Sequence, residues 1–226
     1  MSFDDLLKAF PFAQRADLLD RFLDLVLEAN KTTNLTAIRD KDEAIVKHLY
    51  DCLLPLAITS IEGKKVLDIG SGAGFPGLVF AIVCPTSHLV LCESNGKKAG
   101  FLKKAIEALG LDNAEVLQSR AEEIPGRETY DVITARAVGS LPILLEISAP
   151  LLKKGGTFVS MKGSEGEKEM DGALRAAKEL GLAEVSRNSF ELPEEKGKRV
   201  IGIYTKKAET PHKYPRPYAK MVKRPL

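Results

Sequence analysis

The sequence predicts an α/β protein whose core is a doubly wound, mostly parallel sheet with helices on both faces, preceded by a helical N-terminal extension. From residue 65 onward, short apolar runs typical of buried strands alternate with longer helical stretches, as in parallel sheets. A glycine-rich turn follows the first of these runs, which is typical of doubly wound folds. Of the 226 residues, 44% are apolar and 28% are charged, a composition that allows a buried core and excludes general disorder.

Residues 1–60 are expected to form a helical N-terminal cap. Apolar side chains recur there at the spacing of one helix face, at Leu18, Leu19, Phe22, Leu23, Val26 and Leu27. Short polar residues from Asn30 onward compete for backbone hydrogen bonds and end this helix. Asp40 followed by Glu43 is typical of a second helix start, and Pro55 follows the helix that begins there.

Residues 61–205 are expected to form the main domain. The expected strands lie at 66–69, 88–92, 114–118, 130–134 and 157–161, with two further β-rich stretches at 183–192 and 199–204. The expected helices lie at 77–83, 97–109, 141–152 and 171–180. Residues 206–226 carry seven Lys or Arg against one acid, so they form a basic tail. Four prolines between residues 211 and 225 disfavour a helix and favour an extended path for this tail.

Composition also limits the compartment and the metal chemistry. Cys52, Cys84 and Cys92 are an odd number without a C-x-x-C spacing, so neither a disulfide framework nor a zinc site is expected, and no metal site is predicted. The acidic N-terminus does not resemble a signal peptide, and the longest apolar run, residues 78–84, is too short to span a bilayer. We therefore expect a cytoplasmic protein without a membrane segment.

The loop after the first strand has the composition of a cofactor site. Three glycines allow a tight turn and close approach of a ligand to the backbone: Gly70, Gly72 and Gly74. With Gly77 they satisfy the dinucleotide fingerprint, and Glu93, 21 residues after Gly72, stands where such sites bind a ribose. Asp68 would repel a pyrophosphate, whereas it suits the ammonium and sulfonium groups of S-adenosylmethionine. The loop therefore favours S-adenosylmethionine over NAD and over a purely structural turn.

Two later segments extend this pattern. Residues 119–123 follow the third expected strand, where Glu122 can recognise the edge of an adenine. A Gly-Gly turn at residues 155–156 then separates a helix from the next strand. Together with the loop, these segments resemble class I (Rossmann-like) methyltransferases.

Five segments carry more specific motifs. They are NKTTNLTAI (30–38), LDIGSGAGFPG (67–77), ESNGKK (93–98), SRAEE (119–123) and TARAV (134–138). They resemble the bacterial small-subunit ribosomal RNA guanine-N7 methyltransferases, also called glucose-inhibited division protein B, from about Asn30 to Lys162. The resemblance implies methyl transfer from S-adenosylmethionine to N7 of one guanine in 16S rRNA, as free RNA or in the small ribosomal subunit, without an obligate protein partner. It also implies cofactor contacts from Gly70, Phe75, Glu93, Ala121, Glu122 and Arg136.

The chemistry that the resemblance implies requires little beyond alignment. Guanine N7 has an exposed lone pair, so no proton must leave before it attacks a methyl group, and orientation carries the catalysis. The chain lacks the Asn/Asp-Pro-Pro-aromatic motif typical of amine methylation and has no cysteine after Cys92 for methylation of a pyrimidine carbon. No general base is therefore assigned, and Arg136 and Lys162 are the candidates for a catalytic role.

The residues expected to contact RNA lie at strand ends, in the cap and in the tail. They are Asn34, His48, Arg120, Lys162, Arg216, Lys220, Lys223 and Arg224. Tyrosines among the tail cations, namely Tyr204, Tyr214 and Tyr218, are expected to stack on unpaired bases. A packing role for His48 and a salt bridge for Arg136 are the structural alternatives.

Other functions remain open at this level. The tail departs from the family pattern at Ala219 and Met221, where the family has Gly and Pro. One alternative is a class I methyltransferase acting on another RNA, a protein or a small molecule, and another is a non-catalytic nucleotide-binding module. An NAD-dependent oxidoreductase agrees least with Asp68.

Overall fold

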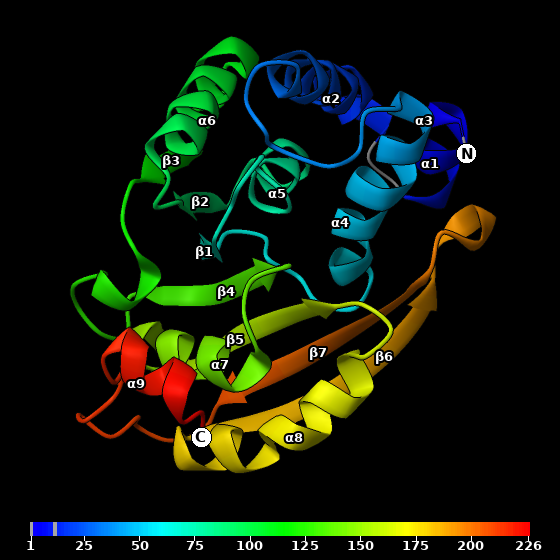
Figure 1. Cartoon of the computed structure of the whole chain (residues 1–226). Coiled ribbons are helices and arrows are strands. Elements are labelled where there is room, and N and C mark those ends of the chain that lie inside the picture. Colours follow the sequence, from blue (N-terminus) through cyan, green and yellow to red (C-terminus); the bar gives the residue numbers. More distant parts are fainter. Residues whose placement is uncertain (1, 11–12) are drawn as a thin grey trace.

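The computed structural model describes residues 2–10 and 13–226, which fold around a seven-stranded sheet (Figure 1). The strands are β1 (Lys65–Ile69), β2 (His88–Cys92), β3 (Ala114–Leu117), β4 (Tyr130–Arg136), β5 (Leu152–Lys162), β6 (Leu182–Glu191) and β7 (Lys198–Lys206). Their order in the sheet is β3-β2-β1-β4-β5-β7-β6. Strands β1 to β5 are parallel, whereas β7 is antiparallel to both β5 and β6. The expectation of a doubly wound, mostly parallel sheet is confirmed.

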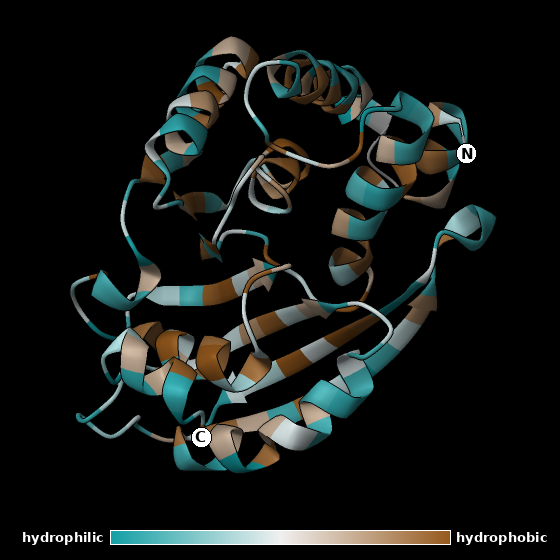
Figure 2. Ribbon diagram, in the orientation of Figure 1, coloured by the Kyte–Doolittle hydropathy of each residue, from teal (hydrophilic) through white to brown (hydrophobic). Residues whose placement is uncertain are grey.

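Helices cover both faces of the sheet, and the sheet separates two apolar clusters. The helices that follow the strands are α5 (Gly77–Val83), α6 (Gly96–Leu109), α7 (Leu141–Leu151) and α8 (Gly166–Glu179). Successive residues of β1 alternate between the faces, so Val66 joins the cluster under α5 and α6, and Leu67 joins the cluster under α7 and α8. Figure 2 shows apolar residues concentrated in the central strands and α5, with hydrophilic residues along α8.

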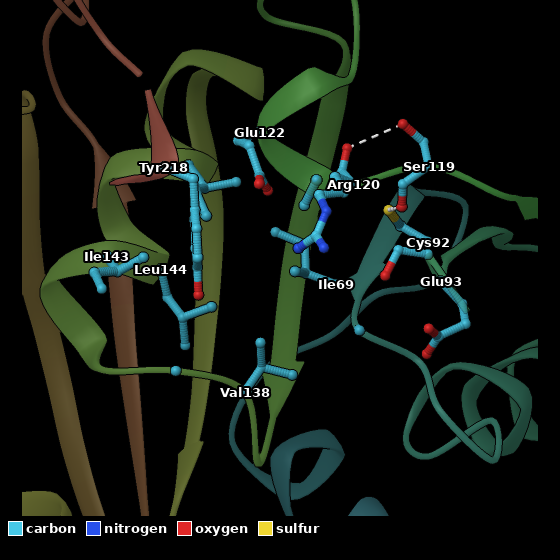
Figure 3. A pocket seen from close by; sticks show the side chains of 15 residues that line it. Ile69, Cys92, Glu93, Ser119, Arg120, Glu122, Val138, Ile143, Leu144 and Tyr218 are labelled. Atoms are coloured by element: carbon cyan, nitrogen blue, oxygen red, sulfur yellow. Dashed lines mark hydrogen bonds between the residues drawn. The ribbon is translucent and has the colours of Figure 1, made fainter. Parts of the chain in front are cut away.

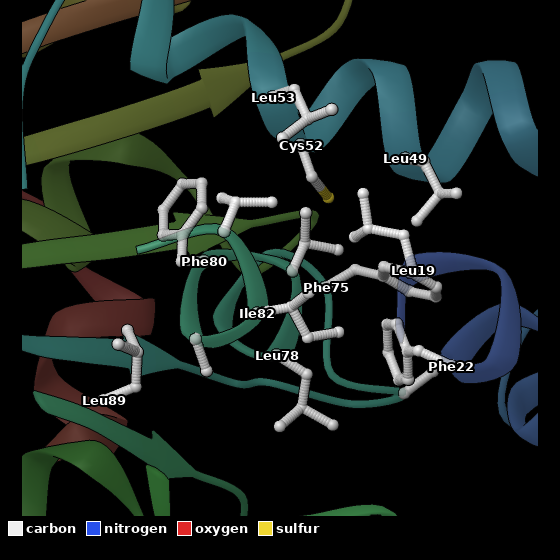
Figure 4. Packing of buried hydrophobic residues seen from close by; sticks show 14 of the residues in the cluster. Leu19, Phe22, Leu49, Cys52, Leu53, Phe75, Leu78, Phe80, Ile82 and Leu89 are labelled. Carbon is white, nitrogen blue, oxygen red and sulfur yellow. The ribbon is translucent and has the colours of Figure 1, made fainter. Parts of the chain in front are cut away.

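The N-terminal cap shares its core with the main domain. It consists of α1 (Phe3–Ala9), η1 (Ala13–Arg15), α2 (Ala16–Asn30), α3 (Lys41–Ala44), the π-helical η2 (Ile45–Tyr50), α4 (Asp51–Leu53) and η3 (Leu54–Ala57). Asp40 caps α3, since its carboxylate accepts a hydrogen bond from the Glu43 N–H at 2.8 Å. Phe22 of α2 packs against Phe75, with ring centroids 5.1 Å apart, and against Leu78 (Figure 4). The cap is therefore packed onto α5 and the glycine loop.

The C-terminal segment is docked and partly helical, so the expectation of an extended tail is wrong. It contains α9 (Tyr218–Lys223), whereas η5 (Pro193–Glu195) lies before β7. Pro217 stands at the N-cap of α9 and Pro225 follows the helix, so the prolines flank the helix and do not interrupt it. Lys206, counted as a tail residue from sequence, is the buried last residue of β7, and its Nζ donates to the Leu152 carbonyl at 2.8 Å. Tyr214 is buried too, and therefore does not offer its ring to RNA.

Three further features concern cysteine, membrane and metal chemistry. Cys52, Cys84 and Cys92 are free and buried, as expected for structural cysteines. Within the part of the chain that the structure describes, no helix is long and apolar enough to cross a membrane. No group of three or more His, Cys, Asp or Glu side chains within residues 2–10 and 13–226 is arranged to hold a metal ion.

Candidate active site

The glycine loop between β1 and α5 depends on glycine for two reasons. Gly70, Gly72 and Gly74 have φ angles of +69°, +57° and +95°, a region that side chains disfavour. A Cβ on Gly70 would lie 2.5 Å from Val138, and one on Gly74 would lie 2.8 Å from Leu78. Neither position therefore has room for a side chain. At Gly72 the nearest atom would be 3.8 Å away, because this glycine faces open space. Gly72 is the position at which a ligand can approach the backbone.

Asp68 lies beneath this loop and lines none of the three pockets described below. Its side chain is on the α5 face of the sheet, where Oδ2 accepts a hydrogen bond from the Gly77 N–H at 3.1 Å. Burial raises the pKa of this carboxyl to about 6. The sequence assigned Asp68 to the cofactor because it stands at a strand end, but the alternation of side chains along β1 directs it to the start of α5. Its observed contacts are those of a residue that fixes the loop.

Glu93 directly follows β2 and connects the glycine loop with the turn before α6. The residue is 8% exposed. Its Oε2 accepts a hydrogen bond from the Gly72 N–H at 3.0 Å, and its Oε1 accepts one from the Asn95 N–H at 2.7 Å. Each carboxylate oxygen has a further lone pair, so Glu93 can still accept hydroxyl donors. Asn95 also caps α6, which begins at Gly96, one residue before the start expected from sequence.

The first pocket opens at the carboxyl ends of β1, β2 and β4 (Figure 3), the edge of a doubly wound sheet at which ligands bind. It is lined by Ile69, Gly70, Cys92, Glu93, Ser94, Ser119, Arg120, Ala121, Glu122, Val138, Gly139, Ile143, Leu144, Ile147 and Tyr218. Ala121 and Glu122, in η4 (Ala121–Glu123), thus line the same pocket as Glu93. Burial raises the pKa of the Cys92 thiol to about 12, which excludes it as a nucleophile at neutral pH.

Sequence reasoning missed one wall of the first pocket. Tyr218 comes from α9, and Ile143, Leu144 and Ile147 come from α7. The apolar spacing of α7 marked it as a core helix, and nothing in the motif pattern indicated that its first turns also face a pocket. Tyr218 was assigned to RNA because it stands among cations.

The second pocket shares Gly70 and Val138 with the first and reaches into the cap. It is lined by Leu35, Thr36, His48, Gly70, Ser71, Gly72, Ala73, Phe75, Lys98, Arg136, Ala137 and Val138. The imidazole of His48 stacks on the Phe75 ring, with centroids 4.3 Å apart and planes 16° apart. Phe75 of the glycine loop and His48 of the cap are thus in direct contact.

Arg136 fixes the protonation state of His48. A guanidinium can only donate, so the 3.0 Å contact from Arg136 Nη2 makes His48 Nδ1 an acceptor. The proton of the imidazole is then on Nε2, which donates to Thr36 Oγ1 at 2.9 Å. Burial, followed by the charge of Arg136, lowers the pKa of His48 to about 3. His48 is therefore a neutral residue with both ring nitrogens engaged.

The third pocket lies on the other side of Arg136 and carries a net positive charge. It is lined by Ile38, Lys47, His48, Asp51, Arg136, Ala137, Met161, Lys162, Gly163 and Arg199. Asp51 of α4 is buried and accepts hydrogen bonds from Arg136 at 2.9 Å and from Arg199 at 3.0 Å, so one carboxylate serves two guanidinium groups. Lys162 also faces this pocket, with its Nζ 3.0 Å from Glu169. The excess of cations suits an anionic ligand such as a phosphate.

The remaining RNA candidates are dispersed. Arg120 lines the first pocket, and Asn34 is exposed and lines none of these three pockets. Lys220, Lys223 and Arg224 line a separate surface groove on α9 together with Arg216. Arg216 is already paired, since its Nε donates to Glu146 at 2.8 Å. Its salt bridge makes Arg216 an anchor of the tail.

Comparison with known proteins identifies the family. Residues 15–197 match the GidB family model, described as rRNA small subunit methyltransferase G. The chain is 39% identical over 213 residues to the ribosomal RNA small subunit methyltransferase G of Lactococcus lactis subsp. lactis, covering 92% of this chain and 89% of that protein. It is 41% identical over 217 residues to the protein of the same name from Caldicellulosiruptor bescii, covering 92% and 91%.

The chain belongs to the rRNA small subunit methyltransferase G family. Solved structures with low sequence identity share its fold. A SAM-dependent methyltransferase from Aquifex aeolicus superposes with a TM-score of 0.56 at 18% identity, covering 72% of this chain and 92% of that one. M. jannaschii TYW2 in complex with AdoMet gives 0.56 at 14% identity, covering 75% and 77%. These similarities confirm that this methyltransferase G chain has the class I fold.

Proposed function

We propose that this S-adenosylmethionine-dependent rRNA methyltransferase acts on N7 of a guanine in 16S rRNA, with the cofactor in the first two pockets and the target nucleotide in the third. The observation that carries this proposal is the row of three adjoining pockets along the carboxyl ends of β1, β2 and β4. In doubly wound sheets, ligands bind at this edge. Gly70 and Arg136, which each line two of the pockets, stand at the boundaries between the proposed subsites.

The first two pockets fit the parts of the cofactor. Glu93 retains lone pairs for the two ribose hydroxyls, and Glu122 offers an acceptor for the amino group of adenine. Gly72 leaves room beside the backbone for the methionine portion in the second pocket. We keep Asp68 in a positioning role, because its carboxylate holds the loop through Gly77.

The residues of the chain supply alignment, charge and shielding from water. Bound S-adenosylmethionine supplies a methyl group on a positively charged sulfur. Three of the five N–H groups of Arg136 are used by Lys47, Asp51 and His48, which leaves two to hold a nucleotide in the third pocket. Lys162 and Arg199 favour the negative phosphates beside that nucleotide. His48 has no free basic nitrogen, in keeping with a reaction in which guanine N7 loses no proton.

The cofactor assignment is tested by replacing Glu93. Glu93→Ala should weaken binding of S-adenosylmethionine by roughly 1–3 kcal/mol, because the ribose hydroxyls lose a charged acceptor in a buried site. Isothermal titration calorimetry measures the affinity. Glu123→Ala, which removes an exposed carboxylate of η4 outside the pocket, is the matched control and should bind the cofactor as the wild type does. Equal affinities for Glu93→Ala and the wild type would refute the ribose assignment.

The substrate assignment needs a transfer assay. The enzyme should be incubated with labelled S-adenosylmethionine and either unmodified small ribosomal subunits or naked 16S rRNA. The position of N7-methylguanine in the product should then be mapped. A single methylated guanine in either substrate supports the proposal. Transfer to a protein, a small molecule or another RNA, with none to 16S rRNA, would favour the alternative that the enzyme has a different substrate.

A further inference from the structure

The helix α9 brings an aromatic side chain to the first pocket from a segment that none of the cofactor motifs includes. Tyr218 is the first residue of α9, is 43% exposed and lines the pocket. In Figure 3 its side chain extends into the pocket between Glu122 and Leu144, and Glu93 lies on the opposite side. The surface that Tyr218 presents to the pocket is therefore the face of a ring.

We propose that Tyr218 is a cofactor-binding residue whose ring stacks on the adenine of S-adenosylmethionine, so that α9 forms the outer wall of the cofactor site. The inference rests on the proposed function and adds a residue to it. The same pocket offers apolar walls from Ile69, Val138 and Leu144 and an acceptor from Glu122. A flat ring that carries an amino group at its edge has the shape and chemistry for that combination, and stacking between a base and an aromatic ring contributes about 1–3 kcal/mol.

The position of Tyr218 is fixed by anchors on both sides of it in sequence. Glu146 of α7 is 1% exposed, and its carboxylate accepts hydrogen bonds from both the backbone N–H and Nε of Arg216 at 2.8 Å. Met221, one turn after Tyr218, is fully buried in the cluster under α7. Arg127 donates to the Tyr214 carbonyl at 3.0 Å. A backbone held in place before binding reduces the conformational entropy that is lost when the cofactor arrives.

Fluorescence gives a direct readout because the sequence contains no tryptophan. Tyr218→Trp introduces a single fluorophore at the proposed stacking position. Titration with S-adenosylhomocysteine, which has the same adenine and cannot transfer a methyl group, should quench its emission in a saturable way. Val222→Trp, at a 53% exposed position of the same helix that does not line the pocket, should show no such change. Quenching of Tyr218→Trp by rRNA and not by S-adenosylhomocysteine would overturn the proposal in favour of base stacking.

Affinity measurements distinguish the contribution of the Tyr218 ring from that of its hydroxyl. They also distinguish a failure of this inference from a failure of the proposed function. Tyr218→Ala should weaken S-adenosylmethionine binding about 5- to 150-fold by calorimetry. Tyr218→Phe should stay within about threefold of the wild type, since stacking requires only the ring, and Val222→Ala should match the wild type. If the wild type binds the cofactor and Glu93→Ala weakens that binding while Tyr218→Ala does not, the inference fails and the proposed function stands. If the wild type does not bind the cofactor, the proposed function itself fails.

Discussion

At the scale of single residues, the contacts of Arg136 determine what His48 can do. The guanidinium occupies Nδ1, burial removes the solvent that would stabilise a second proton, and Thr36 receives the remaining N–H. A histidine near a reactive site is often an acid or a base, but here both ring nitrogens are engaged. The role that these contacts support is structural, since His48 links the cap to Phe75 and to β4.

The depressed pKa of His48 predicts a pH dependence of stability. The pKa of His48 is about 3 in the native state against 6.5 in the unfolded chain, so below pH 6.5 the unfolded state binds a proton that the native state does not. The free energy of unfolding should therefore fall as pH drops from 6.5 towards 3, by at most about 1.4 kcal/mol per pH unit. The pKa of Asp68, raised to about 6, has the opposite effect, since its native carboxyl holds a proton that the unfolded chain releases.

A difference measurement isolates His48 from Asp68. Urea unfolding of the wild type and of His48→Gln should be compared from pH 4 to pH 7.5. Glutamine can still accept from Arg136 and donate to Thr36, and Asp68 is present in both proteins. The stability advantage of the wild type should shrink as pH falls below 6.5 and stay constant above it. His212→Gln, at a side chain that is 83% exposed, is the control for removing a surface histidine. A pH-independent difference between the wild type and His48→Gln would contradict the buried, neutral imidazole.

Sequence reasoning located the residues that belong to local motifs. Glu93, Phe75 and Glu122 each line a pocket, because a glycine loop and two strand ends fix their positions through nearby backbone. Tyr218 could not be placed in the same way. Its contact with the pocket depends on the docking of the tail against Glu146, and a pairing between residues 146 and 216 leaves no local signal in one sequence.

At the scale of elements, the glycines of α5 and α6 differ in their effect on stability. Gly77 begins α5 where a Cβ would lie 2.7 Å from both Asp68 Oδ2 and Leu91 Cδ2, so the strand and the helix approach closely only because this residue has no side chain. Gly100 in the middle of α6 has no atom within 4 Å of a hypothetical Cβ. The first glycine is needed for packing, whereas the second only weakens its helix.

The two glycines therefore predict opposite changes in stability on substitution with alanine. Gly100→Ala should raise the free energy of unfolding by about 0.5–1 kcal/mol, because alanine restricts the unfolded chain and favours helix. Gly77→Ala should lower it by about 1–3 kcal/mol, the usual cost of forcing extra volume into a packed core. Chemical denaturation measures the free energy of unfolding of both variants, and the m-value should be the same as in the wild type. The packing argument would be wrong if both substitutions had the same sign.

The sequence predicted most elements, and the errors have physical causes. Apolar runs marked the strands, but such runs do not record strand direction, so the antiparallel insertion of β7 between β5 and β6 was not foreseen. Prolines were interpreted as excluding helix from the tail, although they stand only at the borders of α9. Helix α8 begins at Gly166, five residues earlier than expected, because its first turn is polar and lacks the apolar period.

At the scale of the whole molecule, a net charge of +2 conceals an uneven distribution. Cations line the third pocket and the groove on α9, both reached from the edge of the sheet that carries the proposed cofactor site. Lys153 and Lys154 stand near the amino end of β5, at the opposite edge. We expect a polyanion such as rRNA to bind on the side that carries the third pocket and the groove on α9.

This asymmetry predicts which lysines carry the salt dependence of RNA binding. Lys220→Ala combined with Lys223→Ala should weaken binding to 16S rRNA, and should lower the slope of log affinity against log salt by about 0.7–0.9 for each phosphate that a lysine no longer neutralises. Filter binding at several salt concentrations measures the slope. Lys153→Ala combined with Lys154→Ala removes the same charge from the other edge and should leave the slope almost unchanged. Equal effects of the two pairs would indicate binding through overall charge alone.

One wall of the first pocket comes from α9, far along the chain from the glycine loop, and this has a consequence for truncated chains. Translation produces Glu93 and the glycine loop well before Tyr218, which is made 125 residues after Glu93. The segment that matches the family model ends at residue 197, also before α9. A gene with a premature stop just after the codons for β7 would therefore encode the whole segment that matches the family model while lacking one side of the first pocket. Such an allele would still match the family model, but its product would lack the α9 wall of the first pocket.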